Sequence, residues 1–285
     1  MNPAPSSGEP GLLILKVGGG LFSDKRRDRH IDLDAVAGFA RLVADLAARA
    51  PSRLILVSGG GSYGHGAVRA AATDAPWDAL RLTHANAELR WVWTTALRDA
   101  GATAFPIQFA AVAVLGQDGR PVLCGDSVRR VLDIGAVPVL TGDCLPTAEG
   151  SLAVVGSDHV PAALLPLARG PVRIAMLTDV DGVLDNGRPV PWIDPDRADT
   201  VRDVLQDAPG WDTTGAMSGK LRGLLDCARL GAECLILRGD TTVADLRYLL
   251  LPTSQWPAGS LHTRIACRSD SLEARSDCEA RVRSR

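Results

Sequence analysis

Short continuous runs of apolar residues recur along this chain, and each ends at or beside a glycine or an aspartate. A run of this length without alternation is typical of a strand that is buried on both faces of a sheet. Five runs of this kind predict strands, at residues 12–17, 53–58, 136–140, 173–178 and 233–237.

Longer stretches that read as helices separate these runs, at residues 33–50, 79–100, 127–134, 160–168 and 217–230. Regular alternation of strand and helix predicts an α/β fold, a three-layer αβα sandwich with a mostly parallel central sheet. Ligands of such sheets bind at the carboxyl ends of the strands. The glycines and aspartates that follow the runs therefore mark the expected active edge.

Three segments depart from the alternation. Residues 1–10 and 268–285 are rich in proline, serine and charged residues, so we expect disordered tails around a single domain that spans residues 11–267. Residues 183–212 hold prolines, aspartates, Trp192 and Trp211. We interpret them as an irregular excursion of that domain on the nucleotide side.

Composition narrows the class of protein. Of the 285 residues, 46% are hydrophobic and 22% are charged, and the net charge is -2. This balance excludes a disordered chain and gives no positive field for a nucleic acid or an anionic membrane. The N-terminus lacks a basic and apolar leader, so we expect a cytoplasmic protein. Six cysteines show no CxxC spacing and indicate reduced thiols.

The use of lysine is more informative. Only three of the 31 basic residues are lysines, and Lys16, Lys25 and Lys220 all lie in or beside glycine-rich segments. A compact ammonium on a flexible stem suits a mobile phosphoryl group better than the planar fork of arginine does. Lys220 also follows a small polar loop at the start of a predicted helix, where a bound anion would relieve its conflict with the helix dipole.

A second glycine-rich segment, residues 59–66, follows a predicted strand and is typical of an anion-binding turn. Gly59, Gly61 and Gly64 match the dinucleotide fingerprint, but no acidic residue ends a second strand where that fingerprint needs one. A dinucleotide-dependent oxidoreductase therefore stays a remote alternative. The chain has no Walker A loop and no protein-kinase signature, so bound phosphate requires another scaffold.

Several motifs occur together and in a fixed order. They are Lys16-x-Gly18-Gly19, the glycine segment with His65, Gly142-Asp143, Ser157-Asp158, residues 178–182, and Thr214-Gly215-x-Met217-x-x-Lys220. As a set they resemble the amino acid kinase superfamily over most of the chain. The sequence around His65 narrows the resemblance to the branch that holds isopentenyl phosphate kinases and fosfomycin kinases. Leu21-Phe22-Ser23 and several later segments are most similar to the fosfomycin kinases.

The resemblance implies transfer of the γ-phosphoryl group of ATP to a phosphonate oxygen, with fosfomycin as the first expected acceptor and antibiotic inactivation or self-resistance as the role. Isopentenyl phosphate, or another small phosphonate or phosphate monoester, is the alternative acceptor. The resemblance also implies Mg2+ carried by the ATP phosphates without protein ligands, and a homodimer. A non-catalytic anion sensor is a remote alternative, against which the complete lysine set argues.

The resemblance assigns roles residue by residue. The expected catalytic residues are Lys16, Lys25, Lys220 and Asp158, with Asp158 orienting the lysines. The expected acceptor-binding residues are His65, Thr214, Ser157, Gly60, Gly61 and Ser62. The expected nucleotide-binding residues are Gly18, Gly19, Thr178, Asp179, Val180 and Gly182, together with Lys220. Gly20 stands where the family usually has serine, and Ser62 matches the isopentenyl phosphate kinases, so the acceptor stays open. Residues 110–115 are candidates to line an apolar pocket for the alternative acceptor.

Overall fold

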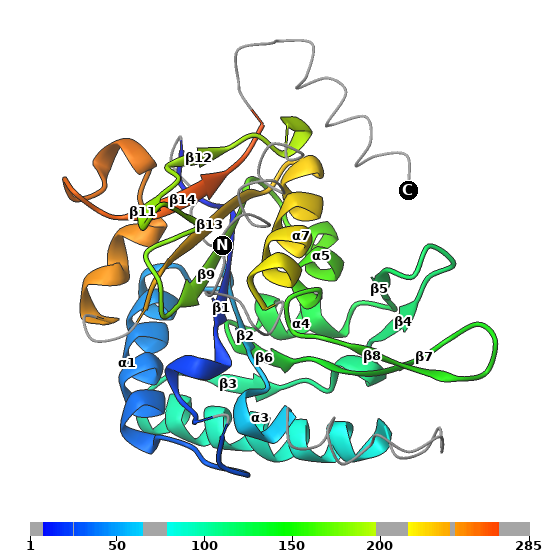
Figure 1. Ribbon diagram of the computed structural model, residues 1–285. Coiled ribbons are helices and arrows are strands. Elements are labelled where there is room, and N and C mark those ends of the chain that lie inside the picture. Colours follow the sequence, from blue (N-terminus) through cyan, green and yellow to red (C-terminus); the bar gives the residue numbers. More distant parts are fainter. Residues whose placement is uncertain (1–7, 25, 65–78, 198–215, 240–242, 268–285) are drawn as a thin grey trace.

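The computed structural model describes residues 8–24, 26–64, 79–197, 216–239 and 243–267 (Figure 1). The tail expected at residues 268–285, and most of the one expected at residues 1–10, lie outside the described residues. Among the described residues, no helix is both long enough and apolar enough to pass through a membrane.

The described residues form an eight-stranded central sheet with the order β12-β14-β13-β9-β1-β2-β6-β3. Six neighbouring strands, from β13 to β3, run parallel, whereas β14 pairs antiparallel with β13 and β12 follows β14. The expected α/β fold with a mostly parallel sheet is confirmed. The strand bounds are β1 Leu12–Val17, β2 Leu54–Ser58, β3 Ala104–Pro106, β6 Val137–Thr141, β9 Val172–Thr178, β12 Trp192–Ile193, β13 Glu233–Arg238 and β14 His262–Ile265.

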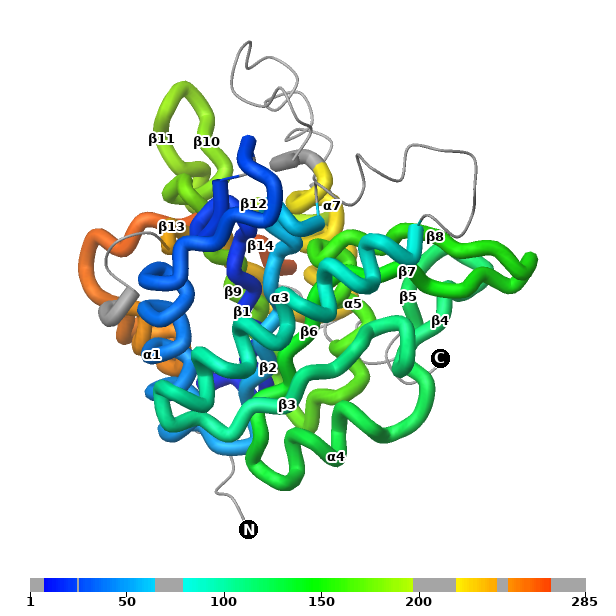
Figure 2. The backbone as a smooth tube through the Cα atoms, turned by 90° about the horizontal axis from the view of Figure 1, so that it is seen from below, coloured from blue at the N-terminus to red at the C-terminus, as the bar shows by residue number. Residues whose placement is uncertain are grey.

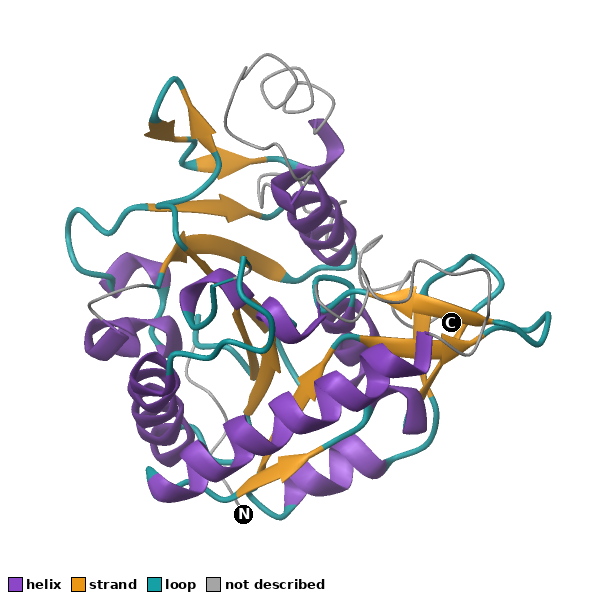
Figure 3. Ribbon diagram, turned by 60° about the horizontal axis from the view of Figure 1, so that its bottom comes forward, coloured by secondary structure: helices purple, strands orange, loops and turns teal. Residues whose placement is uncertain are grey.

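Helices cover both faces of the sheet, as Figures 1 and 3 show. On one face lie α1 (Leu33–Arg49), α3 (Leu80–Asp99) and the 3-10 segment η6 (Val243–Leu250), around a core that includes Phe39 and Trp93. On the other face lie α4 (Ser127–Asp133), α5 (Val160–Leu164) and α7 (Ala216–Arg229). The helix and strand bounds differ from the predicted ones by a few residues, except at α5, where residues 165–167 continue as the 3-10 turn η4.

Alternation along β1 decides which face each side chain meets. Leu13, Leu15 and Val17 pack in the core beneath α1 and α3, while Leu12 and Ile14 pack in the opposite core beneath α5 and α7. Because successive strand residues point to opposite faces, Lys16 belongs to the face of α5 and α7. The strand period therefore directs this ammonium toward those two helices.

The sequence analysis did not predict two short hairpins. Strands β4 (Ala113–Leu115) and β5 (Pro121–Leu123) form one hairpin, and β7 (Asp143–Pro146) and β8 (Leu152–Val155) form a second one next to it (Figure 1). Part of the segment expected to line an apolar pocket, residues 110–115, is thus strand β4, preceded by the turn η3 (Phe109–Ala111). All four strands are short, and β4, β5 and β8 are partly exposed, so they lack the continuous apolar run that marks a buried strand. Strand β7 is mostly buried but begins with the polar residue Asp143.

The segment after residue 183 is more regular than expected. Its described part, residues 183–197, contains a hairpin of β10 (Leu184–Asp185) and β11 (Arg188–Pro189), then β12 and the turn η5 (Pro195–Arg197). Figure 2 shows the hairpin projecting from the body of the molecule. Asn186 and Gly187 join its strands with positive φ angles of 47° and 78°. An Asn-Gly pair is the strongest short hairpin signal, and it was available in the sequence.

Candidate active site

A buried lysine–aspartate pair lies at the carboxyl edge of the sheet. Lys16, near the end of β1, is 2% exposed, and its Nζ donates a hydrogen bond to Oδ1 of Asp158. Asp158 lies in the turn between β8 and α5, and its side chain keeps a quarter of its surface exposed. Because burying an unpaired ammonium is costly, this carboxylate offsets the cost of placing Lys16 beside the first glycine turn.

Lys220 acts on the same carboxylate. Burial by itself raises the pKa of Asp158, but the positive charges of Lys16 and Lys220 outweigh burial and hold this pKa below its usual range. Lys220 is the fifth residue of α7, just past the first turn where the sequence placed it. Gly223, one turn further along, packs against the Asp158 backbone, since a Cβ there would lie 2.6 Å from the Asp158 carbonyl oxygen. Three of the four expected catalytic residues therefore meet at one point.

The two glycine turns touch backbone to backbone. A Cβ on Gly19 would lie 2.5 Å from the Gly61 nitrogen, and a Cβ on Gly59 would lie 2.5 Å from the Gly19 nitrogen. Gly61 also has a φ of +53°, which an L side chain rarely adopts. Glycine is required here because any side chain would push apart the turns that follow β1 and β2.

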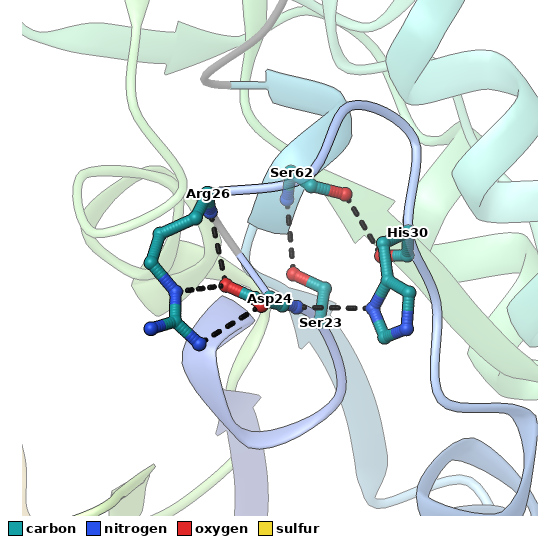
Figure 4. A network of polar contacts seen from close by, with 5 residues as sticks. All are labelled: Ser23, Asp24, Arg26, His30 and Ser62. Carbon is teal, nitrogen blue, oxygen red and sulfur yellow. Dashed lines mark hydrogen bonds and ion pairs between the residues drawn. The ribbon is translucent and has the colours of Figure 1, made fainter.

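Serine hydroxyls bind these turns to the loop that precedes α1 (Figure 4). The Ser62 backbone N–H donates to Ser23 Oγ at 2.9 Å, and Ser62 Oγ donates to the His30 carbonyl oxygen at 2.8 Å. Ser23 Oγ in turn donates to the Gly19 carbonyl oxygen at 2.9 Å. The two groups of Ser62 that could hold an acceptor thus already have protein partners.

The loop after β9, which holds the expected nucleotide-binding residues, lies at the same edge of the sheet. Thr178 Oγ1 donates to the Val180 carbonyl oxygen at 2.9 Å and accepts from the Val180 N–H at 3.2 Å, which folds the chain back. Asp179 is exposed, and Asp181 pairs with Arg238 of β13 at 2.7 Å. Gly182 packs on Thr263 of β14. The Thr178 hydroxyl therefore shapes this loop.

A buried polar stripe on α3 was missed by the sequence analysis. Thr83 Oγ1 donates to Asp143 Oδ1 at 2.6 Å, Asn86 Nδ2 donates to the Gly142 carbonyl oxygen at 2.7 Å, and Arg90 donates to Thr141 Oγ1 at 2.7 Å. The stripe joins α3 to the end of β6. Its signal was a helical spacing of polar residues, at positions 83, 86 and 90, among the apolar residues of a buried face.

Burial and a neighbouring charge have opposite effects on the pKa of Arg90 in this stripe. Burial lowers the pKa of Arg90, and the negative charge of Asp143 opposes that effect. Asp143 is fully buried and accepts two further hydrogen bonds, from the backbone N–H groups of Ala110 and Cys144. Asn86 Oδ1 is buried with no partner among the described residues, and it lies close to Gly60. This amide oxygen therefore leaves a hydrogen-bond acceptor beside the second glycine turn.

Several expected site residues cannot be placed. Lys25, His65 and Thr214 lie outside the described residues. Ser157 does lie at the site, because a Cβ on Gly142 would come within 2.8 Å of its nitrogen. Within the described ranges, no group of three or more histidine, cysteine or acidic side chains could hold a metal ion. What the described residues bring together is two lysines, one carboxylate and two glycine turns, an arrangement suited to a bound anion.

Comparison with known proteins finds a family model and several relatives that match most of this chain. The sequence model of the "Amino acid kinase family" matches residues 11–238. Isopentenyl phosphate kinase of Haloferax volcanii is 33% identical over 222 residues, which cover 75% of this chain and 87% of that protein. Isopentenyl phosphate kinase of Methanothermobacter thermautotrophicus is 30% identical, with 79% and 90% covered.

A solved structure shows the same fold. The product complex of T. acidophilum isopentenyl phosphate kinase aligns with a TM-score of 0.63 at 20% identity, covering 89% of this chain and 99% of that one. At this level of identity the likeness concerns the fold alone, and residue roles have to come from the site itself.

Proposed function

Because the chain belongs to the amino acid kinase family, an ATP-dependent family of small-molecule kinases, we propose that it phosphorylates a phosphate monoester, with isopentenyl phosphate as the first candidate acceptor. The observation that carries the proposal is the buried Lys16 ammonium, held by Asp158 directly before the first glycine turn. A fixed positive charge at this place has its clearest use in holding an anion whose charge changes during the reaction.

The chemistry required of the protein is positioning and charge neutralisation. The oxygen of a phosphate monoester is already an anion, so it attacks the γ-phosphorus of ATP without a general base. The bond to the acceptor oxygen forms as the bond to the β–γ bridging oxygen breaks, and ADP leaves. Lys16 and Lys220 neutralise charge on the transferring group, while Asp158 keeps both ammonium groups directed at it.

Residues outside the described ranges complete the proposal. Lys25 would reach the γ-phosphate or the acceptor, and His65 and Thr214 would hold the acceptor phosphate. The N–H groups of Gly19, Gly60 and Gly61 would face the phosphates as donors, whereas the Gly18 N–H already donates to the Leu177 carbonyl oxygen at 3.0 Å. Residues 178–182 would line the nucleotide site. The expected homodimer stays a prediction that sedimentation equilibrium tests.

Magnesium fits this site only as an ion that is bound by the ATP phosphates. Mg2+ prefers oxygen ligands and usually keeps substrate phosphates among them. Asp158, whose carboxylate lies closest to the lysines, already uses Oδ1 to hold Lys16. The ion would supply charge neutralisation on the β- and γ-phosphates, and this chain's lysines would share that work.

The choice of acceptor rests on similarity. Two relatives at 30% identity or more are isopentenyl phosphate kinases, and each is covered over most of its length. Ser62 also matches those enzymes. Fosfomycin, the first candidate in the sequence analysis, therefore becomes the second candidate. It stays a candidate because Leu21-Phe22-Ser23 and the later segments are most similar to the fosfomycin kinases.

The test measures ADP release by the purified full-length chain with Mg-ATP and separate acceptors: isopentenyl phosphate, fosfomycin and a simple alkyl phosphonate. Phosphorus NMR identifies the product, and the Lys16→Met variant at equal concentration controls for a contaminating kinase. A new diphosphate signal from isopentenyl phosphate supports the proposal. Turnover of fosfomycin alone would replace the acceptor, and no ADP release above the control would overturn the proposal.

A further inference from the structure

The loop between η1 (Gly19–Leu21) and α1 is closed at its base. The Asp32 N–H donates to the Phe22 carbonyl oxygen at 2.8 Å, and Asp32 then caps α1 by accepting from the Ala35 N–H at 2.9 Å. Inside the loop, the Asp24 N–H donates to His30 Nδ1 at 3.2 Å. These bonds join the two arms of the loop, so its position depends on where the loop as a whole is attached.

The loop is attached by two serines and one backbone carbonyl group. We call this set, Ser23, Ser62 and the His30 carbonyl, the serine clasp (Figure 4). Ser62 holds both arms of the loop, since its N–H binds Ser23 on one arm and its hydroxyl binds the His30 carbonyl on the other. Ser23 then ties the clasp to Gly19 of the first glycine turn. Ser62 itself belongs to the helical turn of residues 61–64.

Burial of both serines makes the hydrogen bonds of the clasp costly to lose. Ser62 is fully buried, and Ser23 is 8% exposed. Water therefore has little access to either hydroxyl, and the part-buried carbonyl oxygens of Gly19 and His30 would lose a donor. Space is also short, because a side chain on Gly61 would collide with Ser23 Oγ. A change of either hydroxyl must then shift the loop or the turn.

We propose that the serine clasp is a positioning device, which sets the first glycine turn and the 22–32 loop against the second glycine turn so that donor and acceptor phosphates meet in line. The proposal rests on the proposed phosphoryl transfer. It assigns Ser23 and Ser62 to positioning, through the turns that they join. Reactions that depend on in-line approach lose rate steeply when the reacting groups are misplaced by about 1 Å.

The kinetic test uses variants that each remove different bonds. Ser62→Ala removes the bond to His30, and Ser23→Ala removes both bonds made by that hydroxyl. Ser23→Thr keeps the hydroxyl and is the rescue variant. The matched control is Ser151→Ala at the exposed tip of the β7–β8 hairpin, which loses a 2.8 Å hydroxyl–hydroxyl bond to Thr147.

We expect kcat to fall about fivefold or more in both alanine variants of the clasp, with the KM for ATP within about twofold of the wild type. Ser23→Thr should recover most of the rate, and Ser151→Ala should match the wild type. The double alanine variant should lose less than the product of the single losses, because both changes release the same loop. Wild-type kcat in both single alanine variants would overturn the proposal.

A second measurement does not depend on the acceptor. Hydrogen–deuterium exchange of the full chain should speed up in residues 19–32 of Ser62→Ala and stay unchanged in α1 and in the Ser151→Ala control. Unchanged exchange in residues 19–32 would overturn the clasp. If the wild type turns over none of the acceptors, the proposed function fails, and this exchange experiment still decides whether the clasp holds the loop.

Discussion

Lys16 and Asp158 form one contact although 142 residues separate them along the chain. Lys16 had a signal in the sequence itself, as an unusual lysine before glycines, whereas Asp158 was assigned to the lysines by the family resemblance. No local pattern indicated their hydrogen bond, because a contact between distant residues leaves none, and only the resemblance pointed to it. The lowered pKa of Asp158 follows from the pairing, so the properties of this residue belong to the site as much as to the side chain.

Removing either lysine should slow phosphoryl transfer. We expect Lys16→Met and Lys220→Met each to lower kcat more than tenfold, an effect of at least about 1.4 kcal/mol on the transition state. Methionine keeps the volume of the side chain and removes only its charge. Steady-state turnover with Mg-ATP measures the loss, and circular dichroism checks folding. A variant with wild-type kcat would take that lysine out of the mechanism.

Asp158 should make the free energy of unfolding depend on pH under acidic conditions. The folded pKa of this carboxyl lies below the unfolded one, which is about 3.9. Its contribution to the free energy of unfolding is therefore present above that value and is lost as the pH falls through the folded pKa. In urea unfolding, the difference between wild type and Asp158→Asn should be largest at neutral pH and shrink below about pH 4. A constant difference would contradict this.

Two neighbouring glycines offer a matched comparison. A side chain on Gly19 would meet the Gly61 backbone, whereas a Cβ on Gly20 meets nothing within 4 Å. Gly19→Ala should force the turns apart and lower kcat more than about tenfold. Gly20→Ala should change kcat less than about twofold. Equal effects would show that the contact between the turns has no role in turnover.

At the scale of elements, charged residues also join strands to the segments that cover them. Arg173 of β9 is 3% exposed and pairs with Glu233 of β13 at 2.7 Å. Its guanidinium donates to the carbonyl oxygens of Leu249 and Leu251, and it lies 5.5 Å from the centre of the Trp256 ring. Arg173 therefore holds the segment around η6 against the sheet.

Loss of Arg173 should destabilise the fold without a specific effect on catalysis. We expect Arg173→Met to lower the free energy of unfolding by about 3 kcal/mol, because the buried Leu249 carbonyl and the part-buried Leu251 carbonyl lose their donor and Glu233 loses a partner. The control is Arg49→Met on α1, which breaks an exposed pair with Asp45 and should cost less than about 1 kcal/mol. Urea unfolding measures both, and equal losses would contradict the assignment.

Elements with a strong local pattern were predicted well. All five strands expected from apolar runs exist within one or two residues, because a strand buried on both faces needs a continuous apolar sequence. The short strands β4, β5, β7 and β8 were not predicted, since their pairing in hairpins and their contacts with α3 and η3 replace a local signal. The β10–β11 hairpin was missed although Asn186-Gly187 indicated it.

At the scale of the whole molecule, the parallel strands bring the ends of β1, β2, β6 and β9 to a single edge. A ligand that spans this edge contacts segments that are far apart in sequence, so it should stabilise the entire fold. Mg-ATP at a hundred times its Kd should add about 2.7 kcal/mol to the free energy of unfolding. Thermal unfolding checks this, and a nicotinamide dinucleotide should give no shift. Protection by the dinucleotide alone would favour the oxidoreductase alternative.

The amino acid sequence alone determined the fold class and indicated Lys16 and Lys220 as candidate site residues, because each of these signals is written in residues that are neighbours along the chain. Folding decided the rest: it buried Lys16 against Asp158, brought the charge of Lys220 near the same carboxylate, and buried Asn86 of α3 beside Gly60. It also decided that the polar groups of Ser62 bind other parts of the chain. These outcomes depend on distances between remote segments, which are set by packing of the whole chain and which no local pattern encodes.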